Sequence, residues 1–294
     1  MSAFDPRYGE AIFLTPRITR ITANNPGPFT GAGTNTYLVG RERMMVVDPG
    51  PADEAHIDAI MGALRGRPVS HILITHTHRD HVDGLPLLRQ RVDAPTVAEG
   101  PHREARPLKD GEVNPFLYAA DMDFRPDIVI GDGARIDNGD GVVEAIATPG
   151  HTANHMAFTV DGDCLTGDHV MGWSTTVVAP PDGEMGAYLR SLEKMLEVEH
   201  RLYFPGHGYA VDEPHRAVSA MRAHRLMRER AILERVRMGD RDIAAMVDAL
   251  YVGIDTRLKK AAGLSVQAHL EKLADEGRVI AKGLGADTTW SLAA

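Results

Sequence analysis

Short apolar runs rich in β-branched residues recur along the chain as far as residue 204, and turn-forming residues separate them. Runs of this length and composition predict strands. The predicted strands cover residues 11–14, 18–23, 36–39, 44–47, 69–74, 127–130, 142–147, 155–160, 164–166 and 201–204. Helical patterns lie between them at residues 53–64, 82–91 and 184–198. Strand groups that alternate with single helices in two similar halves predict an α/β fold, in which two mixed sheets pack together with the helices outside.

The pattern becomes mainly helical after residue 212. A long helical stretch with many arginines spans residues 214–238, and three shorter helical patterns follow at 243–250, 255–262 and 265–276. Two strand patterns at 277–280 and 288–292 predict a small hairpin. Three helices followed by a β-hairpin are the layout of a winged helix. We therefore predict two domains, a larger one over residues 1–212 and a winged-helix-like one over residues 213–294.

Two stretches lack a regular pattern. Residues 25–35 form a loop rich in proline and glycine that is too long for a tight turn, so it either faces a substrate or ends a hairpin. Residues 100–125 carry scattered charge with little periodicity, and we interpret them as a partly ordered lid.

Composition narrows the class of protein. A net charge of −9 argues against a surface that is basic throughout and binds duplex nucleic acid. The single cysteine, Cys164, excludes an internal disulfide framework and fits a reducing compartment. No basic start precedes an apolar stretch at the N-terminus, and no apolar run approaches the roughly 20 residues of a membrane-spanning helix. We expect a cytoplasmic protein without a membrane segment.

Four side chains that commonly bind metals crowd into the loop after predicted strand 69–74: His76, His78, Asp80 and His81. Burying adjacent polar groups stabilises no core unless each has a partner, which makes a purely structural role a poor explanation. Alternate residues of extended backbone point the same way, so His76 and His78 face one point. Imidazole nitrogens with a carboxylate suit zinc. The loop predicts a metal site, and a polar surface loop is the alternative.

Three later loops each add one such side chain directly after a predicted strand. These are His151, Asp168 and His207, and their glycine or proline neighbours let the backbone approach a shared point. Seven ligands can hold two zinc ions. The predicted division is His76, His78 and His151 for one ion, Asp80, His81 and His207 for the other, and Asp168 as the bridge.

Two divalent ions about 3.5–4 Å apart can share a hydroxide that is nucleophilic near neutral pH. The pattern therefore predicts a metal-dependent hydrolase that needs no serine or cysteine nucleophile, with Asp80 also orienting the attacking water. Iron or manganese could replace zinc, because the same ligands accept all three metals. The candidates for supporting the ligands or facing the substrate are Asp48, Asn35, Thr75 and His155.

The other histidines are expected on surfaces or helix faces: His56, His71, His102, His200, His215, His224 and His269. Cys164 is expected to be a small buried residue, because no neighbour in sequence would activate its thiol.

The motif His76-x-His78-x-Asp80-His81, together with His151, Asp168 and His207, resembles that of the metallo-β-lactamase superfamily over roughly residues 10–212. The resemblance implies an αβ/βα sandwich with a binuclear metal site at one edge. Antibiotic hydrolysis is not expected, since true lactamases usually differ at the position of Asp80 or elsewhere.

Segments 25–39 and 167–192 are similar to the branch known as β-lactamase-like protein 2. That branch carries a winged-helix-like tail and includes a mitochondrial endoribonuclease acting on single-stranded RNA, besides many bacterial hydrolases. Its likeness implies single-strand RNA cleavage as one activity, with the arginines of the tail guiding the polymer.

Two other functions stay open at this point. The metal motif is also similar to that of glyoxalase II, which implies a hydrolase of small thioesters or esters. A non-catalytic regulator that senses metal and binds DNA through the winged helix is the third hypothesis. The tail could instead be a packing module or a contact in a homo-oligomer.

Overall fold

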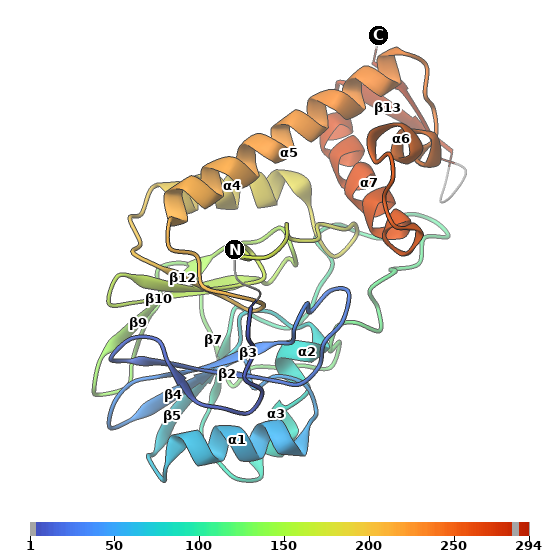
Figure 1. The fold of residues 1–294 in the computed structure, drawn as a ribbon. Helices are drawn as coiled ribbons and strands as arrows, with labels where there is room; N and C mark the ends of the chain where they lie inside the picture. The colour runs from blue at the N-terminus through green and yellow to red at the C-terminus, as the bar shows by residue number, and fades with distance from the viewer. Residues whose placement is uncertain (1–3, 284–287, 294) are drawn as a thin grey trace.

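The computed structural model describes residues 4–283 and 288–293; residues 1–3, 284–287 and 294, which the predicted domain ranges include, lie outside the described residues. Two β-sheets lie face to face at its centre (Figure 1). The first sheet contains seven strands in chain order, antiparallel from β1 to β4 and parallel from β4 to β7. They span Ile12–Phe13 (β1), Ile18–Thr22 (β2), Asn35–Val39 (β3), Met44–Val47 (β4), Val69–Leu73 (β5), Thr96–Ala98 (β6) and Ile128–Val129 (β7).

The second sheet contains five strands in the order β12-β11-β10-β9-β8. Its strands pair antiparallel, except β11 and β12, which run parallel. They span Arg135–Asp137 (β8), Val142–Ala147 (β9), Met156–Val160 (β10), Asp163–Gly167 (β11) and Tyr203–Pro205 (β12). The two mixed sheets confirm the predicted sandwich.

Strand β4 shows why the sheets stack. Successive side chains of a strand point to opposite faces. Met44 and Val46 pack on the outer side with α1 (Glu54–Leu64), whereas Met45 and Val47 pack on the inner side against the second sheet. All four are buried, because both faces of this strand are covered.

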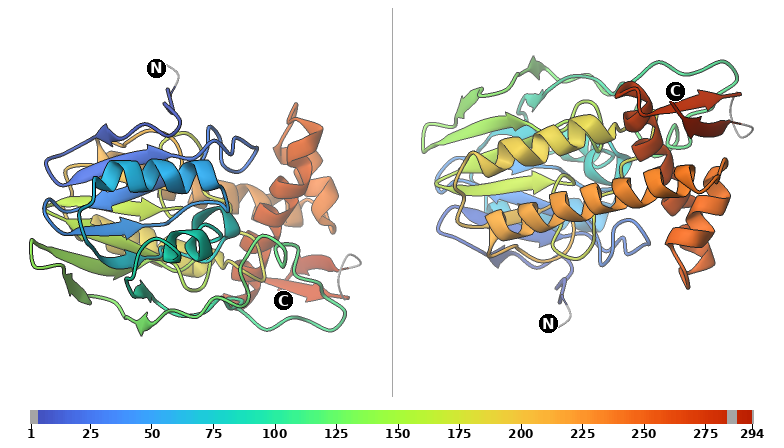
Figure 2. Two further views of the ribbon diagram at one scale, coloured as in Figure 1. Left: turned by 90° about the horizontal axis from the view of Figure 1, so that it is seen from below. Right: turned by 90° about the horizontal axis from the view of Figure 1, so that it is seen from above.

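Helices cover the two outer faces of the sandwich (Figure 2). Helix α1 and α3 (Leu85–Arg89) lie on the first sheet, and α4 (Met185–Leu196) lies on the second. Asp53 caps α1 by accepting a hydrogen bond from the amide of Ala55 at 2.9 Å.

The single helix predicted over 82–91 is wrong. The chain forms α2 (Arg79–Val82) and then α3, with Gly84 between them. A Cβ atom at Gly84 would lie 2.7 Å from the carbonyl oxygen of Pro49, so the break is fixed by a close approach of two backbones. The short strands β6 and β8 were not predicted, because three residues carry too little pattern.

The C-terminal part has a hydrophobic core of its own, which includes Trp290. Its elements are α5 (Pro214–Arg237), α6 (Ile243–Leu250), a 3-10 turn at Thr256–Leu258, α7 (Lys259–Asp275), β13 (Val279–Lys282) and β14 (Thr289–Leu292). The separate helices predicted over 255–262 and 265–276 are wrong, because α7 continues through Gly263. A glycine in a helix costs only about 1 kcal/mol, and burial of Ala262 and Val266 on either side of it offsets this.

Most arginines of α5 make contacts within the protein. Arg225 is buried, its guanidinium donates to the carbonyl oxygen of Thr176, and its Cζ lies 5.4 Å from the ring centroid of Tyr188. Further pairs join Arg216 to Glu213, Arg222 to Glu193, Arg235 to Asp240 and Arg237 to Glu234. Arg222 and Arg225 therefore tie α5 to the sandwich, whereas the pairs of Arg216, Arg235 and Arg237 stay within α5 and the residues next to it.

Replacing Arg225 by alanine should lower the free energy of unfolding by about 2–3 kcal/mol, because the buried carbonyl oxygen of Thr176 loses its donor and α5 loses packing. Urea unfolding measures the change. Arg230 is exposed on the same helix, and its alanine variant should stay within about 0.5 kcal/mol of the parent. Equal effects of the two substitutions would contradict a packing role for Arg225.

Among the described residues, no helix is both long enough and apolar enough to cross a membrane.

Candidate metal centre

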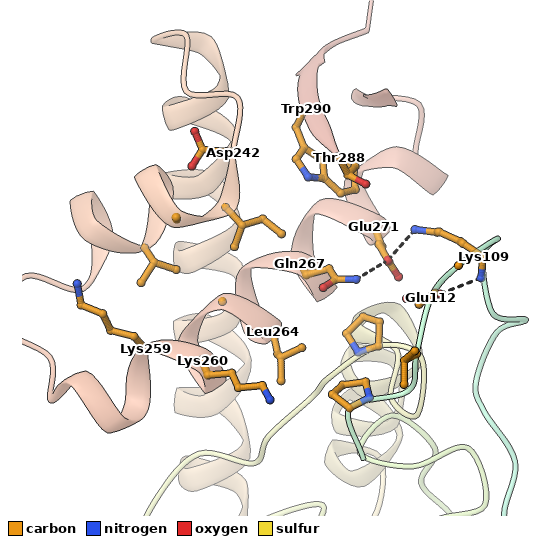
Figure 3. A pocket seen from close by; sticks show the side chains of 18 of the residues that line it. Lys109, Glu112, Asp242, Lys259, Lys260, Leu264, Gln267, Glu271, Thr288 and Trp290 are labelled. Atoms are coloured by element: carbon orange, nitrogen blue, oxygen red, sulfur yellow. Dashed lines mark hydrogen bonds and ion pairs between the residues drawn. The ribbon is translucent and has the colours of Figure 1, made fainter. Parts of the chain in front are cut away.

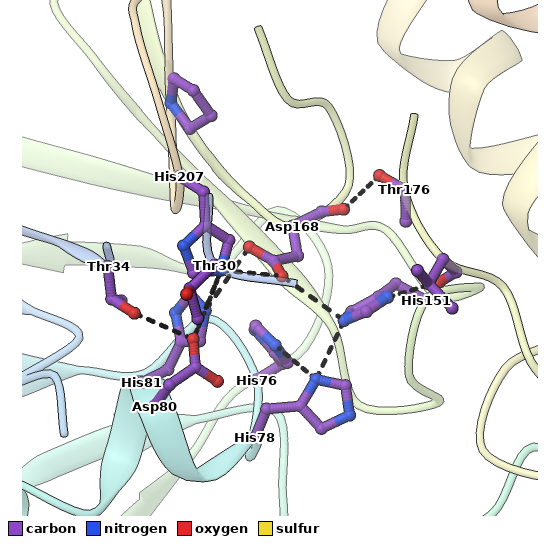
Figure 4. A network of polar contacts seen from close by, with 12 residues as sticks. Thr30, Thr34, His76, His78, Asp80, His81, His151, Asp168, Thr176 and His207 are labelled. Atoms are coloured by element: carbon purple, nitrogen blue, oxygen red, sulfur yellow. Dashed lines mark hydrogen bonds and ion pairs between the residues drawn. The ribbon is translucent and has the colours of Figure 1, made fainter. Parts of the chain in front are cut away.

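The seven predicted metal-binding side chains lie together at one edge of the sandwich (Figure 4). They come from the segments that follow β5, β9, β11 and β12, so four strand ends supply them. They are His76, His78, Asp80, His81, His151, Asp168 and His207. All but His78 and Asp80 are buried.

Three imidazoles form the first ligand group. The Nε2 atom of His76 lies 3.1 Å from Nδ1 of His78, which in turn lies 3.0 Å from Nε2 of His151. A tetrahedral zinc ion with nitrogen ligands at about 2.0–2.1 Å places those nitrogens roughly 3.3 Å apart. The group has the spacing needed to hold one ion.

Asp80, His81 and His207 form the second group. The Oδ2 atom of Asp80 lies 3.4 Å from Nε2 of His81 and 3.3 Å from Nε2 of His207. The two imidazole nitrogens are 3.3 Å apart. This group could hold a second ion by the same criterion.

Asp168 faces both groups. Its Oδ2 atom lies 3.7 Å from Nε2 of His151 and 3.3 Å from Nε2 of His207, and its Oδ1 atom lies 3.5 Å from Nε2 of His81. One carboxylate that reaches ligands of both groups is in the position of a bridge between two ions.

In four of the histidines, Nδ1 points away from the centre and Nε2 points into it. The contact that Nδ1 makes determines whether Nε2 has a free lone pair for a metal ion. Each outer Nδ1 contacts an oxygen that can only accept from it, so it carries the ring's proton. These oxygens are Thr75 Oγ1 for His76 at 3.0 Å, Asp48 Oδ2 for His81 at 2.8 Å, Val177 O for His151 at 2.6 Å and Gly33 O for His207 at 3.2 Å. The hydroxyl of Thr75 already donates to Asp48, which leaves it as an acceptor for His76. In the neutral rings, four Nε2 lone pairs therefore converge, as in metal sites whose histidines are held from outside.

The electrostatics of the centre also favour a cation. Burial and the neighbouring His81 and His78 lower the pKa of His76 well below its ordinary value, and burial lowers the pKa of His151 to about 4. Burial alone would lower the pKa of His81 too, but Asp80 and Asp168 raise it well above its usual range. The negative charges of Asp80 and Asp168 thus favour a positive charge beside them, and a bound metal ion would supply it.

Asp48 holds the first loop in place from behind. Its carboxylate accepts from the amide and the hydroxyl of Thr75 at 2.8 and 2.7 Å, and it contacts His81. The residue has a φ of 53°, a left-handed conformation that is strained for a side chain other than glycine. Asp48 and Thr75, two of the candidates for supporting the ligands, contact His81 and His76 respectively.

Asn35 and His155 hold the other loops. The side-chain amide of Asn35 donates to the carbonyl oxygens of Pro205 and Gly208, both at 3.0 Å, on either side of His207. The Nε2 atom of His155 accepts from the amide of Asp168 at 3.1 Å. Each residue fixes the backbone of one ligand.

Two supporting residues were missed. Thr34 donates from Oγ1 to Oδ2 of Asp80 at 2.9 Å, and its only sequence signal was its place in the loop 25–35. Asp182 lies 3.9 Å from Nε2 of His78 and 3.4 Å from Nε2 of His102. Burial opposes ionisation of Asp182, yet His102 and His78 hold the pKa of its carboxyl well below the usual range. Nothing near Asp182 in sequence indicated this role.

The remaining histidines were predicted on surfaces or helix faces. This is wrong for His102 and His200, which are buried outside any helix, whereas His56 lies on α1 and His269 on α7. His56, His102, His200 and His269 are buried. All four contact a threonine hydroxyl or a carboxylate: His56 touches Thr36, His102 touches Thr77, His200 touches Thr159, and His269 lies 3.5 Å from Glu229. A local polar partner allowed each ring inside. Cys164 is buried as expected, and burial raises the pKa of its thiol to about 12.

Gly206 is required by the close approach of the ligands. A Cβ atom there would lie 2.5 Å from Oδ1 of Asp168 and 2.7 Å from Cε1 of His81. Gly206→Ala should therefore leave the fold intact and lower the metal affinity roughly 10–100-fold, the range seen when supporting contacts are lost. Metal titration of chelator-treated protein measures this. Gly62→Ala, where a Cβ would meet nothing within 4 Å, should bind metal like the parent; equal affinities for both variants would refute the crowding argument.

The family model described as the metallo-beta-lactamase superfamily matches residues 29–207, which contain all seven candidate ligands. The chain belongs to the metallo-beta-lactamase superfamily. A second model, described as a beta-lactamase associated winged helix domain, matches residues 243–290 and confirms the predicted type of tail. Members of this superfamily usually bind metal ions, and the chain is a metal-dependent hydrolase of the superfamily.

Similarity to known relatives and to solved structures supports the assignment to this superfamily. A beta-lactamase-like protein 2 homolog of Caenorhabditis elegans is 31% identical over 90% of this chain and 87% of its own. An atrochrysone carboxyl ACP thioesterase of Aspergillus chevalieri is 30% identical over 94% of this chain and 87% of its own. The crystal structure of a beta-lactamase domain protein from Burkholderia ambifaria superposes with a TM-score of 0.80 at 19% identity, covering 99% of this chain and 96% of that one, which shows the shared fold.

Proposed function

We propose that this superfamily member is a binuclear zinc hydrolase that cleaves thioesters. The observation that carries the two-metal part is the convergence of four Nε2 lone pairs on two carboxylates, Asp80 and Asp168, at separations that suit tetrahedral zinc. We assign His76, His78 and His151 to one ion, Asp80, His81 and His207 to the other, and Asp168 to both.

Two ions held in this way would polarise the substrate carbonyl and lower the pKa of a water molecule between them. The chain's own groups orient the reaction. Asp80 is the ligand nearest to solvent, its side chain being 28% exposed, and Thr34 and His207 hold its Oδ2 atom. The other oxygen, Oδ1, can then hold the proton of the attacking water. Burial opposes ionisation of Asp80, but His81 and His207 lower its pKa and keep it an acceptor at neutral pH.

The choice of thioesters rests on two supports. A relative that matches nearly the whole chain is named as a thioesterase acting on an acyl carrier protein. In addition, Arg222 and Arg225 of α5 are engaged with the sandwich, which weakens the case for a polymer guide along this part of the helix. Cleavage of single-stranded RNA stays a prediction from the resemblance and is included in the test.

The test combines metal analysis with two substrates. Purified protein should contain two metal ions per chain and hydrolyse an acyl-coenzyme A thioester, whereas labelled single-stranded RNA should stay intact. His76→Ala should abolish turnover, and His215→Ala, on an exposed part of α5, should not. Turnover that survives in His76→Ala, or RNA cleavage without thioester turnover, would refute the proposal.

A further inference from the structure

A cavity of about 920 Å³ lies between the C-terminal domain and the loop 109–115 (Figure 3). This volume is at the upper end of the range for small-molecule sites, about 300–1,000 Å³. Its apolar walls come from α6, α7 and the loop, and include Val113, Pro115, Ile243, Val247 and Leu264. None of the seven candidate metal ligands lines this cavity.

Trp290 on β14 gives the first sign of a ligand. Its side chain is only 2% exposed, and its Nε1 donor has no hydrogen-bond partner within the described residues. Trp290 lines the cavity, and Figure 3 shows its ring nitrogen turned toward the side where Gln267 lies. A buried N–H without an acceptor is unfavourable, so a ligand with an oxygen acceptor would satisfy it.

The charges around the cavity leave one amine without a partner. Glu271 pairs with Arg106 and Lys109, both at 2.8 Å, and Arg106 also neutralises Glu112. The remaining acids are engaged as well: Asp248 pairs with Lys259 at 2.7 Å, and Asp242 caps α6 at the amide of Ala245.

Lys260 differs from these residues. It lines the cavity from α7, and within the described ranges it has neither an ion pair nor a hydrogen bond. Its ammonium group is free to bind an anion.

Two segments of the cavity wall continue along the chain to residues beside His78. Pro115 lines the cavity, and the next residue, Phe116, places its ring 6.4 Å from that of His78. Pro180 lines the cavity too, and Asp182, two residues on, lies 3.9 Å from Nε2 of His78. The two segments that line this side of the cavity therefore also reach the first ligand group.

We propose that this cavity binds the phosphopantetheine arm of an acyl thioester, as carried by coenzyme A or by an acyl carrier protein; this inference rests on the proposed thioesterase function. An amide carbonyl of the arm accepts from Nε1 of Trp290, the phosphate pairs with Lys260, and the methyl and methylene groups lie on the apolar walls. The acyl group is thereby directed to the metals.

Kinetics with matched substrates test the site. In the holoenzyme, Trp290→Phe and Lys260→Gln should each raise KM for S-acetyl-phosphopantetheine about 10-fold and leave kcat unchanged, the size expected for one lost hydrogen bond or charge-assisted contact. The KM for S-acetyl-N-acetylcysteamine, which lacks the phosphate and most of the arm, should not change in Lys260→Gln. Lys282→Gln, on β13 outside the cavity, should behave like the parent with both substrates.

Equal changes of KM for the long and the short substrate in Lys260→Gln would overturn the proposal. A lower KM for acetyl-coenzyme A than for S-acetyl-phosphopantetheine would assign the arm to coenzyme A, and equal values would assign it to a carrier protein; either supports the site.

A binding measurement separates this inference from the thioesterase proposal. The chain has two tryptophans, so a Trp173→Phe variant reports only on Trp290. Titration with desulfo-coenzyme A, which has no thiol to bind a metal, should change its fluorescence, and Lys260→Gln should weaken the apparent Kd about 10-fold. Binding without thioester hydrolysis would refute the function and keep the site, whereas hydrolysis without this binding would refute the site.

Discussion

Asp168→Ala should lower kcat/KM by about 10³-fold and reduce the metal content below two ions per chain. The carboxylate contacts ligands of both groups, at 3.3 Å from His207 and 3.7 Å from His151, so its loss removes one ligand from each proposed ion. An ion that is bound loosely stabilises the transition state less. A loss of about 4 kcal/mol of this stabilisation corresponds to about three powers of ten in rate. Metal analysis and steady-state kinetics on the same preparation measure both effects.

The fold should survive this substitution, because Asp168 is held by contacts to its backbone. Its amide donates to His155, and its carbonyl oxygen accepts from Thr176. Circular dichroism checks this, and Asp212→Ala, at an exposed position before α5, serves as the matched control with full activity. An Asp168→Ala protein that keeps two ions and a tenth or more of the activity would contradict the bridging position.

The second large effect is expected at Asp48. Asp48→Asn should lower the free energy of unfolding by about 2–4 kcal/mol and weaken metal binding roughly 10–100-fold. The carboxylate accepts from the amide and hydroxyl of Thr75 and from Nδ1 of His81, all within 2.8 Å. An asparagine presents one oxygen and one amide that can only donate, so at least one buried donor loses its acceptor.

Urea unfolding and competition with a chelator measure the two quantities for Asp48→Asn. Asp58→Asn, on the exposed side of α1, changes the same atoms and should alter neither by more than about 0.5 kcal/mol. Normal metal affinity together with lowered stability would show that Asp48 supports the fold without orienting His81.

Two of the contacts between the C-terminal domain and the hydrolase sandwich lie close to the metal centre. Arg225 on α5 reaches Thr176, and Thr176 in turn donates to the carbonyl oxygen of Asp168. Glu271 on α7 holds Arg106 and Lys109 at the start of the loop that leads to His78. The winged-helix-type domain therefore contacts the segment that follows Asp168 and the loop that passes beside His78, which fits a role in positioning the substrate.

The sequence by itself determined the parts of this protein that local pattern controls. The stretch from His76 to His81 contains four candidate ligands of both groups within six residues, and the short β-branched apolar run before it predicts a strand. The loops bearing His151, Asp168 and His207 were predictable because each follows a strand, and strand ends meet at the edge of a sheet. Local pattern also predicted the winged-helix layout.

Only the tertiary structure decided which groups support the ligands and what lies beside them. The acceptors for His151 and His207 are backbone carbonyls of Val177 and Gly33, which any residue type could supply, so no sequence motif marks them. The break at Gly84 depends on the approach of Pro49, more than thirty residues away. The orphan donor of Trp290 became visible only when the wing packed over the loop 109–115. In each case the cause is a contact between distant segments, which close packing fixes and local propensity does not encode.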